Sequence, residues 1–300
     1  MTQPSFAIMG CGRLGTALGK HLVKAGYPLA GLTGKSESSI EESARIIATD
    51  PVRGLPPWEI TRKADVVFIT TPDGIISEAC KTLTDHNGFK KNAVVLHCSG
   101  AHPSTILSSA RQGAGALIGS MHPLQSFASK DLPGNPFMGI IVSVEGSDEA
   151  VKIASAMAAG LGARVLPIRT EAKTMYHASA VAASNYLVTL FDLAIRLMKT
   201  AGVSSEEAFG VLKPLVEGTL SNIENVGIPQ ALTGPIARGD TQTVEGHIEA
   251  MKSLTPELIP LYTILGSYTI DIARAKGGVS EEALDKLIRI LRAPPATLTD

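Results

Sequence analysis

The sequence predicts an α/β domain built on a parallel, doubly wound sheet, followed by an all-α C-terminal domain. Up to residue 168, short apolar runs alternate with helical patterns across short loops. These runs lack polar alternation, which is typical of strands covered by helices on both faces. After residue 168, strand patterns disappear and long helical patterns take over. We therefore expect one domain over residues 1–168 and a second, helical domain over residues 169–300.

The expected elements follow from the spacing of apolar residues. The β-rich runs predict strands at residues 5–9, 28–33, 66–70, 93–98, 116–120, 139–144 and 164–167. Helical spacing predicts helices at residues 14–24, 148–161, 171–201, 204–225, 241–253, 256–276 and 280–292. Ser204 and Ser280 each stand just before a pair of glutamates, so both are expected to cap helices.

Charge and composition exclude several classes of protein. Lys and Arg number 27 and Asp and Glu 28, so no basic stripe supports a nucleic-acid partner. The N-terminus lacks the basic region of a signal peptide, and no run of about 18 apolar residues predicts a membrane span. The three scattered cysteines, Cys11, Cys80 and Cys98, indicate buried thiols in a reducing compartment. A cytoplasmic protein without a membrane partner is expected.

The most specific motif is the glycine-rich segment GCGRLG at residues 10–15. It directly follows an apolar strand and opens an amphipathic helix, as a dinucleotide-binding Rossmann loop requires. Gly10 permits the tight turn, Gly12 lets a pyrophosphate approach the backbone, and Gly15 allows the helix to pack closely on the strand. The helix N-terminus offers free N–H groups to the phosphates. The first domain is therefore expected to be a Rossmann domain that binds a dinucleotide.

The end of the second strand indicates which dinucleotide is bound. An NAD enzyme normally carries Asp or Glu there for the ribose hydroxyls. Here no acid occurs before Glu37, whereas Lys35 offers a cation and Thr33 and Ser36 offer hydroxyls. This set suits a 2′-phosphate, so NADP is favoured over NAD. The alternative is that Lys35 is a solvated loop residue.

Two later strand ends should complete the cofactor cleft, because ligands of open α/β sheets lie beyond the carboxyl ends of the strands. Residues 71–72 and 99–100 are expected to line the ribose and nicotinamide, and Asp73 is expected to cap a helix. The full set of expected cofactor-binding residues is Gly10, Gly12, Arg13, Leu14, Gly15, Thr33, Lys35, Ser36, Thr71, Pro72, Ser99 and Gly100.

Histidines gather near these strand ends, but their spacing does not predict a metal site. His97, His102 and His122 occur without a C-x-x-C or H-E-x-x-H pattern. The segment 120–127 is expected to leave a strand as a loop in which His122 and Gln125 contact a substrate. The alternative is a turn whose polar residues have no functional role.

The helix expected after residue 170 carries a second group of candidates. At about 100° per residue, Lys173, His177 and Ser184 fall on one face, with Asn185 at its edge. Lys173 and His177 are close enough to share a small substrate, which Asn185 joins only if the substrate is extended or the helix bends. The alternative for His177 is a core histidine satisfied by hydrogen bonds.

Several motifs along nearly the whole chain resemble those of a known family. They are GCGRLG at 10–15, HCSG at 97–100, HPLQ at 122–125, YH at 176–177 with SN at 184–185, and LTGP at 232–235 with RGD at 238–240. The pattern resembles a bacterial family that pairs a Rossmann-like domain with a helical domain of unknown function. Members are labelled NADP-dependent or deazaflavin-coenzyme-dependent oxidoreductases.

More distantly, the layout is similar to ketopantoate reductase, pyrroline-carboxylate reductase and the 6-phosphogluconate dehydrogenase-like enzymes. The resemblance implies an all-α C-terminal domain of the 6-phosphogluconate dehydrogenase-like type and a homodimer through its helices. Those relatives use a lysine and asparagines on the first helix after the Rossmann domain, and Lys173 and Asn185 occupy comparable positions. His177 stands where an asparagine is expected, so the substrate and the proton donor of those relatives do not carry over directly to this chain.

We expect an NADP(H)-dependent oxidoreductase that reduces a small carbonyl or imine. The expected catalytic residues are His177 as general acid, Lys173 and Asn185. The expected substrate-binding residues are Ser99, His122, Gln125 and Arg238, the last as a clamp for a carboxylate. Two alternatives stay open: reduction of a deazaflavin coenzyme, and a non-catalytic NADP-binding sensor or scaffold.

Overall fold

The computed structural model describes residues 3–51 and 54–292. By internal contacts the chain forms two compact units, Met1–Ala183 and Ser184–Asp300. The unit boundary lies inside the long helix α7 (Lys173–Thr200), whereas strand structure ends at Pro167. The expected boundary at residue 168 thus marks the change from strands to helices. The boundary between the compact units lies later, within α7, between Ala183 and Ser184.

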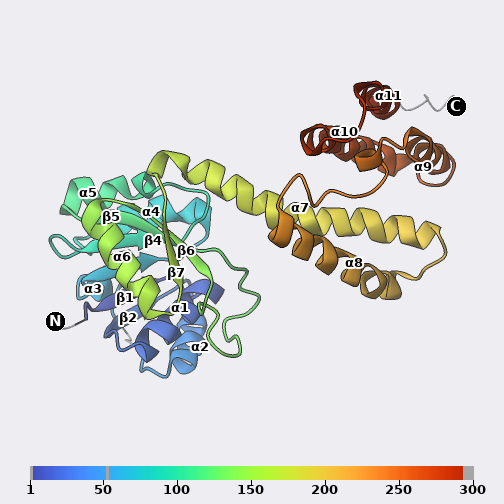
Figure 1. Cartoon of the computed structure of the whole chain (residues 1–300). Helices are drawn as coiled ribbons and strands as arrows, with labels where there is room; N and C mark the ends of the chain where they lie inside the picture. The colour runs from blue at the N-terminus through green and yellow to red at the C-terminus, as the bar shows by residue number, and fades with distance from the viewer. Residues whose placement is uncertain (1–2, 52–53, 293–300) are drawn as a thin grey trace, which may run out of the picture. The chain divides into compact units, whose positions relative to one another are not determined.

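The first unit is built on a seven-stranded sheet with the order β2-β1-β3-β4-β5-β6-β7 (Figure 1). The strands are β1 Phe6–Met9, β2 Leu29–Thr33, β3 Val66–Ile69, β4 Val94–His97, β5 Leu117–Pro123, β6 Ile141–Gly146 and β7 Arg164–Pro167. All seven expected strands are confirmed to within a few residues. Strand order reverses at β1, whose neighbours β2 and β3 lead to opposite sides, and such a switch point is where open α/β sheets bind ligands.

One pairing differs from the expected all-parallel sheet: β5 and β6 run antiparallel, while the other neighbours are parallel. Parallel neighbours need a crossover connection, usually a helix. The β5–β6 connection, residues 124–140, contains neither helix nor strand, so β6 returns along β5 in the opposite direction. This pairing also lengthens β5 to Pro123, so His122 lies in the strand and not in the loop that the sequence predicted.

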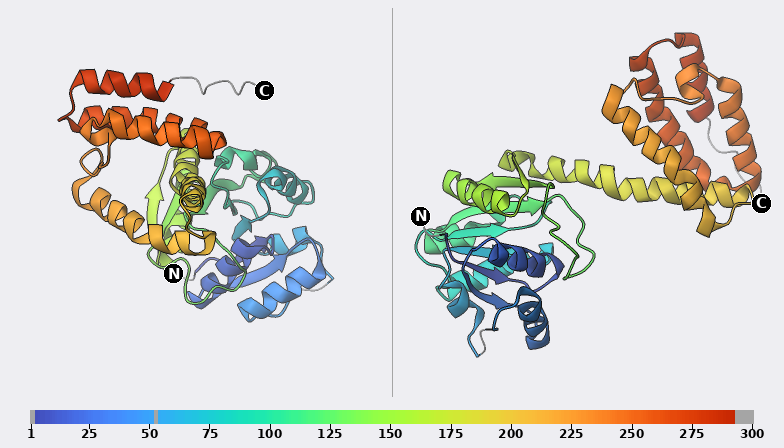
Figure 2. Two further views of the ribbon diagram at one scale, coloured as in Figure 1. Left: turned by 90° about the vertical axis from the view of Figure 1, so that its right-hand side faces the viewer. Right: turned by 60° about the horizontal axis from the view of Figure 1, so that its bottom comes forward.

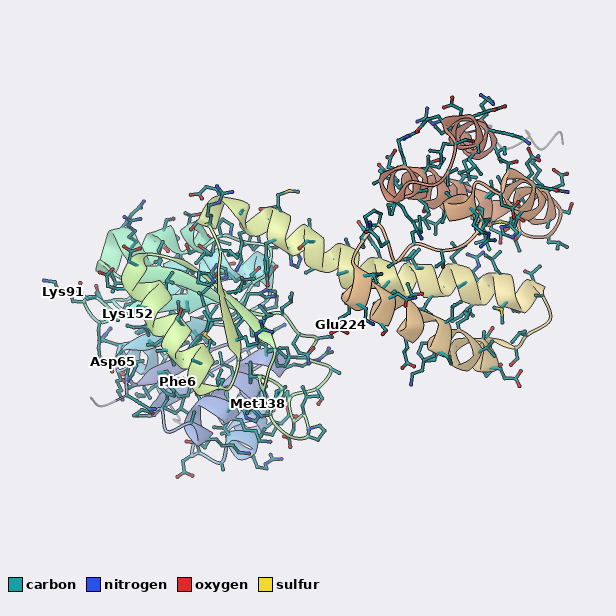
Figure 3. All side chains as sticks on the ribbon, in the orientation of Figure 1. Phe6, Asp65, Lys91, Met138, Lys152 and Glu224 are labelled. Carbon is teal, nitrogen blue, oxygen red and sulfur yellow. The ribbon has the colours of Figure 1, made fainter. Side chains whose placement is uncertain are left out.

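Helices cover both faces of the sheet (Figures 1 and 2). On one face lie α1 Arg13–Lys24, α2 Glu37–Ile47 and α6 Asp148–Gly160, and on the other lie α3 Pro57–Thr61, α4 Ile76–Asp85 and α5 Ser108–Ala114. Apolar side chains of the central strands fill both layers; Phe6 is fully buried, whereas Asp65, Lys91 and Lys152 lie at the surface (Figure 3). Each such buried large side chain contributes about 1.5–3 kcal/mol.

The second unit is helical, as predicted. It contains the rest of α7 with α8 Ser205–Val226, α9 Thr241–Leu254, α10 Ile259–Lys276 and α11 Glu281–Arg292. The two predicted caps are confirmed, because Ser204 Oγ accepts from Glu207 N and Ser280 Oγ accepts from Ala283 N, both at 3.3 Å. A core of α9, α10 and α11 side chains stabilises this unit.

Helix α8 leaves most of its apolar side chains uncovered. Ala208 is its one buried residue among the described part of the chain. The large apolar side chains of α8 that are more than a third exposed are Phe209, Val211, Leu215, Leu220, Ile223 and Val226. Burying them would release free energy in proportion to their apolar area, so the exposed apolar side chains of α8 favour association.

Helix α7, with the turn before it, has the length and composition of a membrane-spanning helix, although the sequence contains no continuous run of about 18 apolar residues. The segment from Thr170 to Thr200 has a mean hydropathy of 1.4 in its most apolar window and is long enough to cross a membrane. Only 6% of that window is buried. Length and composition alone do not distinguish a membrane span from a helix that packs against another protein.

Candidate active site

The glycine-rich loop lies between the end of β1 and the start of α1. Gly10 adopts φ +121°, and a Cβ there would lie 2.7 Å from the backbone carbon of Thr70. A Cβ on Gly15 would collide with the Gly10 carbonyl oxygen, so the helix packs on the strand only because both positions are glycine. A Cβ on Gly12 would meet nothing within 4 Å. The loop therefore holds open space above Gly12, where a pyrophosphate could approach the backbone.

The first turn of α1 offers amide groups to that space. Gly12 is the N-cap and makes no side-chain capping bond, and Arg13 and Leu14 are the first helical residues. The first amide with a carbonyl partner in the helix is that of Thr16, which donates to Gly12 O at 3.0 Å. The preceding amides have no intrahelical partner and carry the positive end of the helix dipole. This end of α1 fits the phosphates of a dinucleotide.

Hydrogen bonds to helix α2 and strand β2 hold the glycine-rich loop in place. The carbonyl oxygen of Cys11 accepts from Ser39 Oγ at 3.1 Å and from Ser43 Oγ at 3.4 Å. Cys11 Sγ donates to Thr33 O at 3.3 Å, and burial raises the pKa of the thiol. Cys11, like the other two cysteines, is buried and free, which confirms the structural role predicted for the thiols.

The residues expected to meet a 2′-phosphate lie at the end of β2 and the start of α2. Lys35 is exposed, and no ion pair of Lys35 occurs in the described part of the chain. Ser36 caps α2, its Oγ accepting from Ser39 N at 3.3 Å. Thr33 is buried, and its carbonyl oxygen accepts from Gly10 N at 2.8 Å. A cation thus stands beside the N-terminus of α2, an arrangement that fits a phosphate.

The end of β3 supplies an unpaired polar atom. Thr71 Oγ1 is buried and has no hydrogen-bond partner among the described residues. Buried hydroxyls are rarely left unpaired, so a bound ligand would satisfy it. The expectation that Asp73 caps a helix is wrong: a 3₁₀ turn, Asp73–Ile75, has Pro72 at its N-cap and no side-chain capping bond.

Two histidines converge on Gly100, just beyond the end of β4. A Cβ on Gly100 would lie 2.6 Å from His177 Nδ1 and 2.8 Å from His122 Nε2. The backbone turn before it is held by Ser99, whose Oγ accepts from Ala101 N at 3.1 Å and His102 N at 3.2 Å. His177 is half-buried, and its Nδ1 has no hydrogen-bond partner in the described chain. The histidine of α7 therefore lies at the strand ends, where the sequence analysis expected it.

His122 is the more enclosed of the pair. Its Nδ1 lies 3.4 Å from the Tyr176 hydroxyl, and its ring centre lies 6.3 Å from that of His177. Burial and, after it, the positive charge of Lys173 together lower the pKa of His122 to about 4. At neutral pH, His122 is therefore an uncharged imidazole.

Lys173 faces the sheet and not the solvent. Its side chain is fully buried, and Nζ donates to Ser120 Oγ at 2.7 Å. Burial lowers the pKa of Lys173 to about 8, although the charge of Glu145 opposes that shift. The sequence suggested that Lys173 contacts a substrate directly, whereas in the structure it contacts Ser120.

The partner of Lys173 belongs to a row of polar side chains across three strands. In the sheet register, His97 of β4 pairs with Ser120 of β5, and Ser120 pairs with Glu145 of β6. All three are at most 1% exposed. The sequence analysis missed Glu145; the one available signal was a carboxylate and a serine inside the otherwise apolar strand IVSVEG.

The buried carboxylate of Glu145 accepts several hydrogen bonds. Ser104 donates to it from N at 2.8 Å and from Oγ at 2.7 Å, and Thr170 donates from Oγ1 at 2.9 Å. Burial raises the pKa of Glu145, but hydrogen bonds from Ser120, Ser104 and Thr170 outweigh it and hold the pKa below its usual value. Glu145 is therefore ionised at neutral pH and can compensate the ammonium of Lys173.

Three of the predicted site residues lie apart from this cluster or in the other unit. Gln125 is exposed beyond β5, and its Oε1 accepts from Ser126 N at 3.3 Å. Asn185 in α7 and Arg238 in the 3₁₀ turn Ile236–Arg238 belong to the second unit, so their roles stay predictions. Over residues 3–51 and 54–292, no group of three or more His, Cys, Asp or Glu could hold a metal ion.

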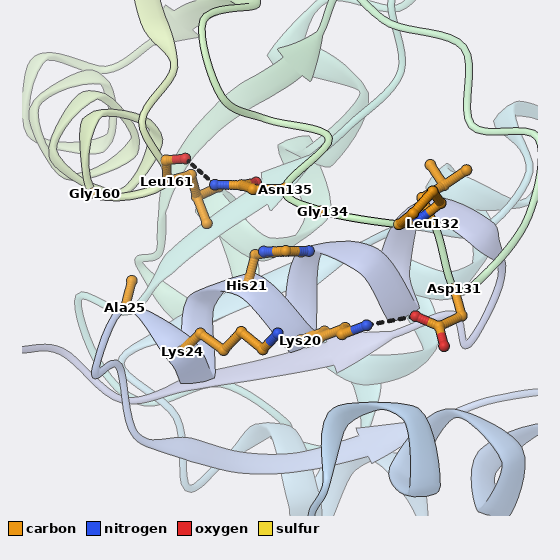
Figure 4. A pocket seen from close by; sticks show the side chains of 11 residues that line it. Lys20, His21, Lys24, Ala25, Asp131, Leu132, Gly134, Asn135, Gly160 and Leu161 are labelled. Carbon is orange, nitrogen blue, oxygen red and sulfur yellow. Dashed lines mark hydrogen bonds and ion pairs between the residues drawn. The ribbon is translucent and has the colours of Figure 1, made fainter.

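A hollow of about 710 Å³ lies elsewhere on the first unit, against the last turns of α1 (Figure 4). Lys20, His21 and Lys24 line one side of it, and Lys20 is paired with Asp131. It faces the C-terminal end of α1, opposite to the amide groups at the N-terminus, so it is not part of the phosphate site.

Two family models match the chain. A Rossmann-like domain covers residues 2–123, and the domain of unknown function DUF2520 covers residues 140–269. The chain combines a Rossmann-like domain with a DUF2520 domain. The resemblance predicted from the motifs is confirmed. The glycine-rich loop and His122 lie in the Rossmann-like match, whereas Glu145, Lys173 and His177 lie in the DUF2520 match, so the candidate site draws on both.

Solved structures share this fold over nearly the whole chain. A provisionally assigned NADP oxidoreductase from Bacteroides fragilis is 23% identical, with a TM-score of 0.70 over 90% of this chain and 99% of that one. A reductive aminase from Aspergillus terreus in complex with NADPH and ethyl levulinate is 17% identical, with a TM-score of 0.64 over 96% and 100%. A pyrroline-5-carboxylate reductase from Coxiella burnetii is 15% identical, with a TM-score of 0.58 over 96% and 98%. No curated protein matches the chain.

Proposed function

We propose that this protein is an NADP(H)-dependent oxidoreductase that reduces a small carbonyl or imine. The observation that carries the proposal is the convergence of His122 and His177 on Gly100, at the same sheet edge as the open glycine-rich loop. The fold is that of dinucleotide-binding reductases, among them a reductive aminase and a pyrroline-5-carboxylate reductase. Imine or carbonyl reduction needs one proton donor beside the cofactor, and the cluster offers one.

The residues present fit a nicotinamide dinucleotide. The amides of Arg13 and Leu14 would hold its pyrophosphate, and Lys35 its 2′-phosphate. The unpaired hydroxyl of Thr71 would find a partner in its ribose or nicotinamide. When bound, the cofactor supplies the hydride.

The chain itself supplies the proton and the orientation. His177 Nδ1, which has no protein partner among the described residues, would hold the proton that passes to the substrate oxygen or nitrogen. Uncharged His122 would hydrogen-bond the same polar group through Nε2, because Tyr176 lies against Nδ1. Ser99 and Gly100 hold the turn on which both rings converge.

The proposal is tested by a screen of keto acids, cyclic imines and deazaflavins as substrates, in which the oxidation of NADPH is measured. We expect turnover with at least one carbonyl or imine. Turnover with deazaflavins alone would support a coenzyme reductase instead, and NADPH binding without any turnover would support a sensor.

Replacing Lys35 by aspartate is expected to flatten or reverse a preference for NADP(H) over NAD(H). One charge-assisted contact is worth about 1.5–3 kcal/mol, and the carboxylate would repel the 2′-phosphate. Calorimetric titration with both cofactors measures the preference, and Lys63→Asp, another surface lysine of the same unit, serves as the matched control. Equal affinity of the unmodified protein for NADP(H) and NAD(H) would contradict the assignment.

We further propose that the protein is a homodimer that buries apolar helices of its second unit. The sequence suggested residues 186–197 and 258–272 for this role. In the structure both segments expose large apolar side chains, among them Val188, Ile264 and Tyr268, and α8 exposes six more. The expected result is a dimer by light scattering at micromolar concentration, which Leu215→Glu and Leu220→Glu together convert to a monomer. A monomeric unmodified protein would refute this.

A further inference from the structure

Ser120 is the middle residue of the row His97–Ser120–Glu145, and His122 follows it by two residues in β5 and so points to the same face of the sheet. Lys173 approaches this face from α7 and donates to Ser120. A buried ammonium is therefore hydrogen-bonded to the residue two positions before a histidine that the proposed function places at the substrate. Burying such an ion costs several kcal/mol unless a partner compensates it, and Glu145 is that partner.

We propose that Lys173 is a positioning residue: held by a hydrogen bond to Ser120 and compensated by the charge of Glu145, it places a fixed positive charge near His122, so that His122 acts as a neutral hydrogen-bonding group and His177 as the proton donor. This inference rests on the proposed function for the roles of the two histidines. The arrangement of the charge itself is independent of any reaction.

The geometry supports this division between the two histidines. Lys173 is fully buried, while His177 lies one turn further along α7 and is half-buried. The charged and titratable groups that act on His122 are Lys173 and His177 from α7, His97 from β4 and Asp73 from the turn after β3. Of these, Lys173 acts most strongly after burial itself, and it disfavours a second positive charge on His122. Two titratable groups in unlike environments are a usual way to separate an acid from a hydrogen-bonding group.

The test is a pH titration of His122 by NMR in the cofactor-free protein with labelled histidines, assigned with His122→Asn. Lys173→Met combined with Glu145→Gln removes both charges and leaves no unpaired ion. We expect the pKa of His122 to rise by about one unit in this double variant, because the like charge of Lys173, which disfavours the charged imidazole, is removed. Ser120→Ala, which keeps both charges, and Lys90→Met, which removes a surface lysine paired with Asp65, should leave it close to the unmodified value.

An unchanged pKa of His122 in the double variant would overturn the proposal. An equal shift in Ser120→Ala would also overturn it, because hydrogen bonding and not the fixed charge would then control His122. If the double variant does not fold, the unmodified protein still tests the proposal, because a charged His122 at about pH 6 refutes it.

The titration separates this inference from the proposed function. If the pKa of His122 shifts in the double variant but the protein has no reductase activity, the positioning role of Lys173 stands and the proposed reductase function is refuted. Where turnover is found, the double variant should lose rate mainly on the acid side of its pH profile, where His122 becomes charged. A uniform rise in KM at every pH would instead make Lys173 a direct substrate ligand and overturn the positioning role.

Discussion

Replacing His177 by alanine is expected to lower turnover by about a hundredfold or more while leaving the affinity for NADPH nearly unchanged. The loss is the usual scale for removing a general acid. The affinity should persist because the pyrophosphate would be held at the N-terminus of α1, and His177 belongs to α7. Single-turnover rates and calorimetric NADPH titrations measure the two quantities separately.

His86→Ala is a matched control, because His86 lies at the surface and stacks on Trp58 in the same unit. It should change neither quantity. If His177→Ala retained most of its turnover, the proton would come from elsewhere, and Tyr176 would be the next residue to replace. If His177→Ala lost NADPH binding as well, the residue would be structural.

Substituting valine at two glycines of one loop is expected to separate cofactor binding from folding. Gly12→Val should weaken NADPH binding by about a hundredfold, or roughly 2.7 kcal/mol, because its side chain would fill the open space required by the pyrophosphate. Its effect on unfolding should stay within about 1 kcal/mol, since the added Cβ meets no atom within 4 Å. Gly15→Val should lower the free energy of unfolding by about 3 kcal/mol, because it forces the helix off the strand.

Urea unfolding and NADPH titration of both variants measure these effects. The unmodified protein and Gly74→Val, at an exposed turn where a Cβ also has open space, are the references. A Gly12→Val protein that binds NADPH normally would place the pyrophosphate somewhere other than this loop. A stable Gly15→Val protein would contradict the close packing of α1 on β1.

Much of the fold could be predicted from local sequence patterns. The apolar strands are short, lack polar alternation and are separated by turns, so all seven were found. The direction of β6 could not be predicted, because it depends on the absence of a crossover helix over residues 124–140 and not on the strand's own residues. The apolar surface of α8 was also missed, since helical periodicity does not tell which faces have a partner within the chain.

The candidate site was predicted in part. The positions of His177 and Gly100 near one strand end followed from helix phase and strand order. The burial of Lys173 did not, because a lysine at the start of an amphipathic helix usually lies in solvent. Its charge is compensated by Glu145, 28 positions earlier, which comes beside Ser120, the hydrogen-bond partner of Lys173, only through the pairing of β5 with β6.

The alternation along β5 has a consequence for how this segment can evolve. Ser120 and His122 point to the polar row, and Met121 between them is fully buried in the core on the opposite face. A strand repeats every two residues, so gaining or losing one residue before Ser120 would exchange the two faces over the rest of the strand. Methionine would then meet Glu145 and Lys173, and serine and histidine would enter an apolar layer. The lineage of this protein can therefore exchange side chains in β5 one at a time, but it cannot change the length of the strand by a single codon.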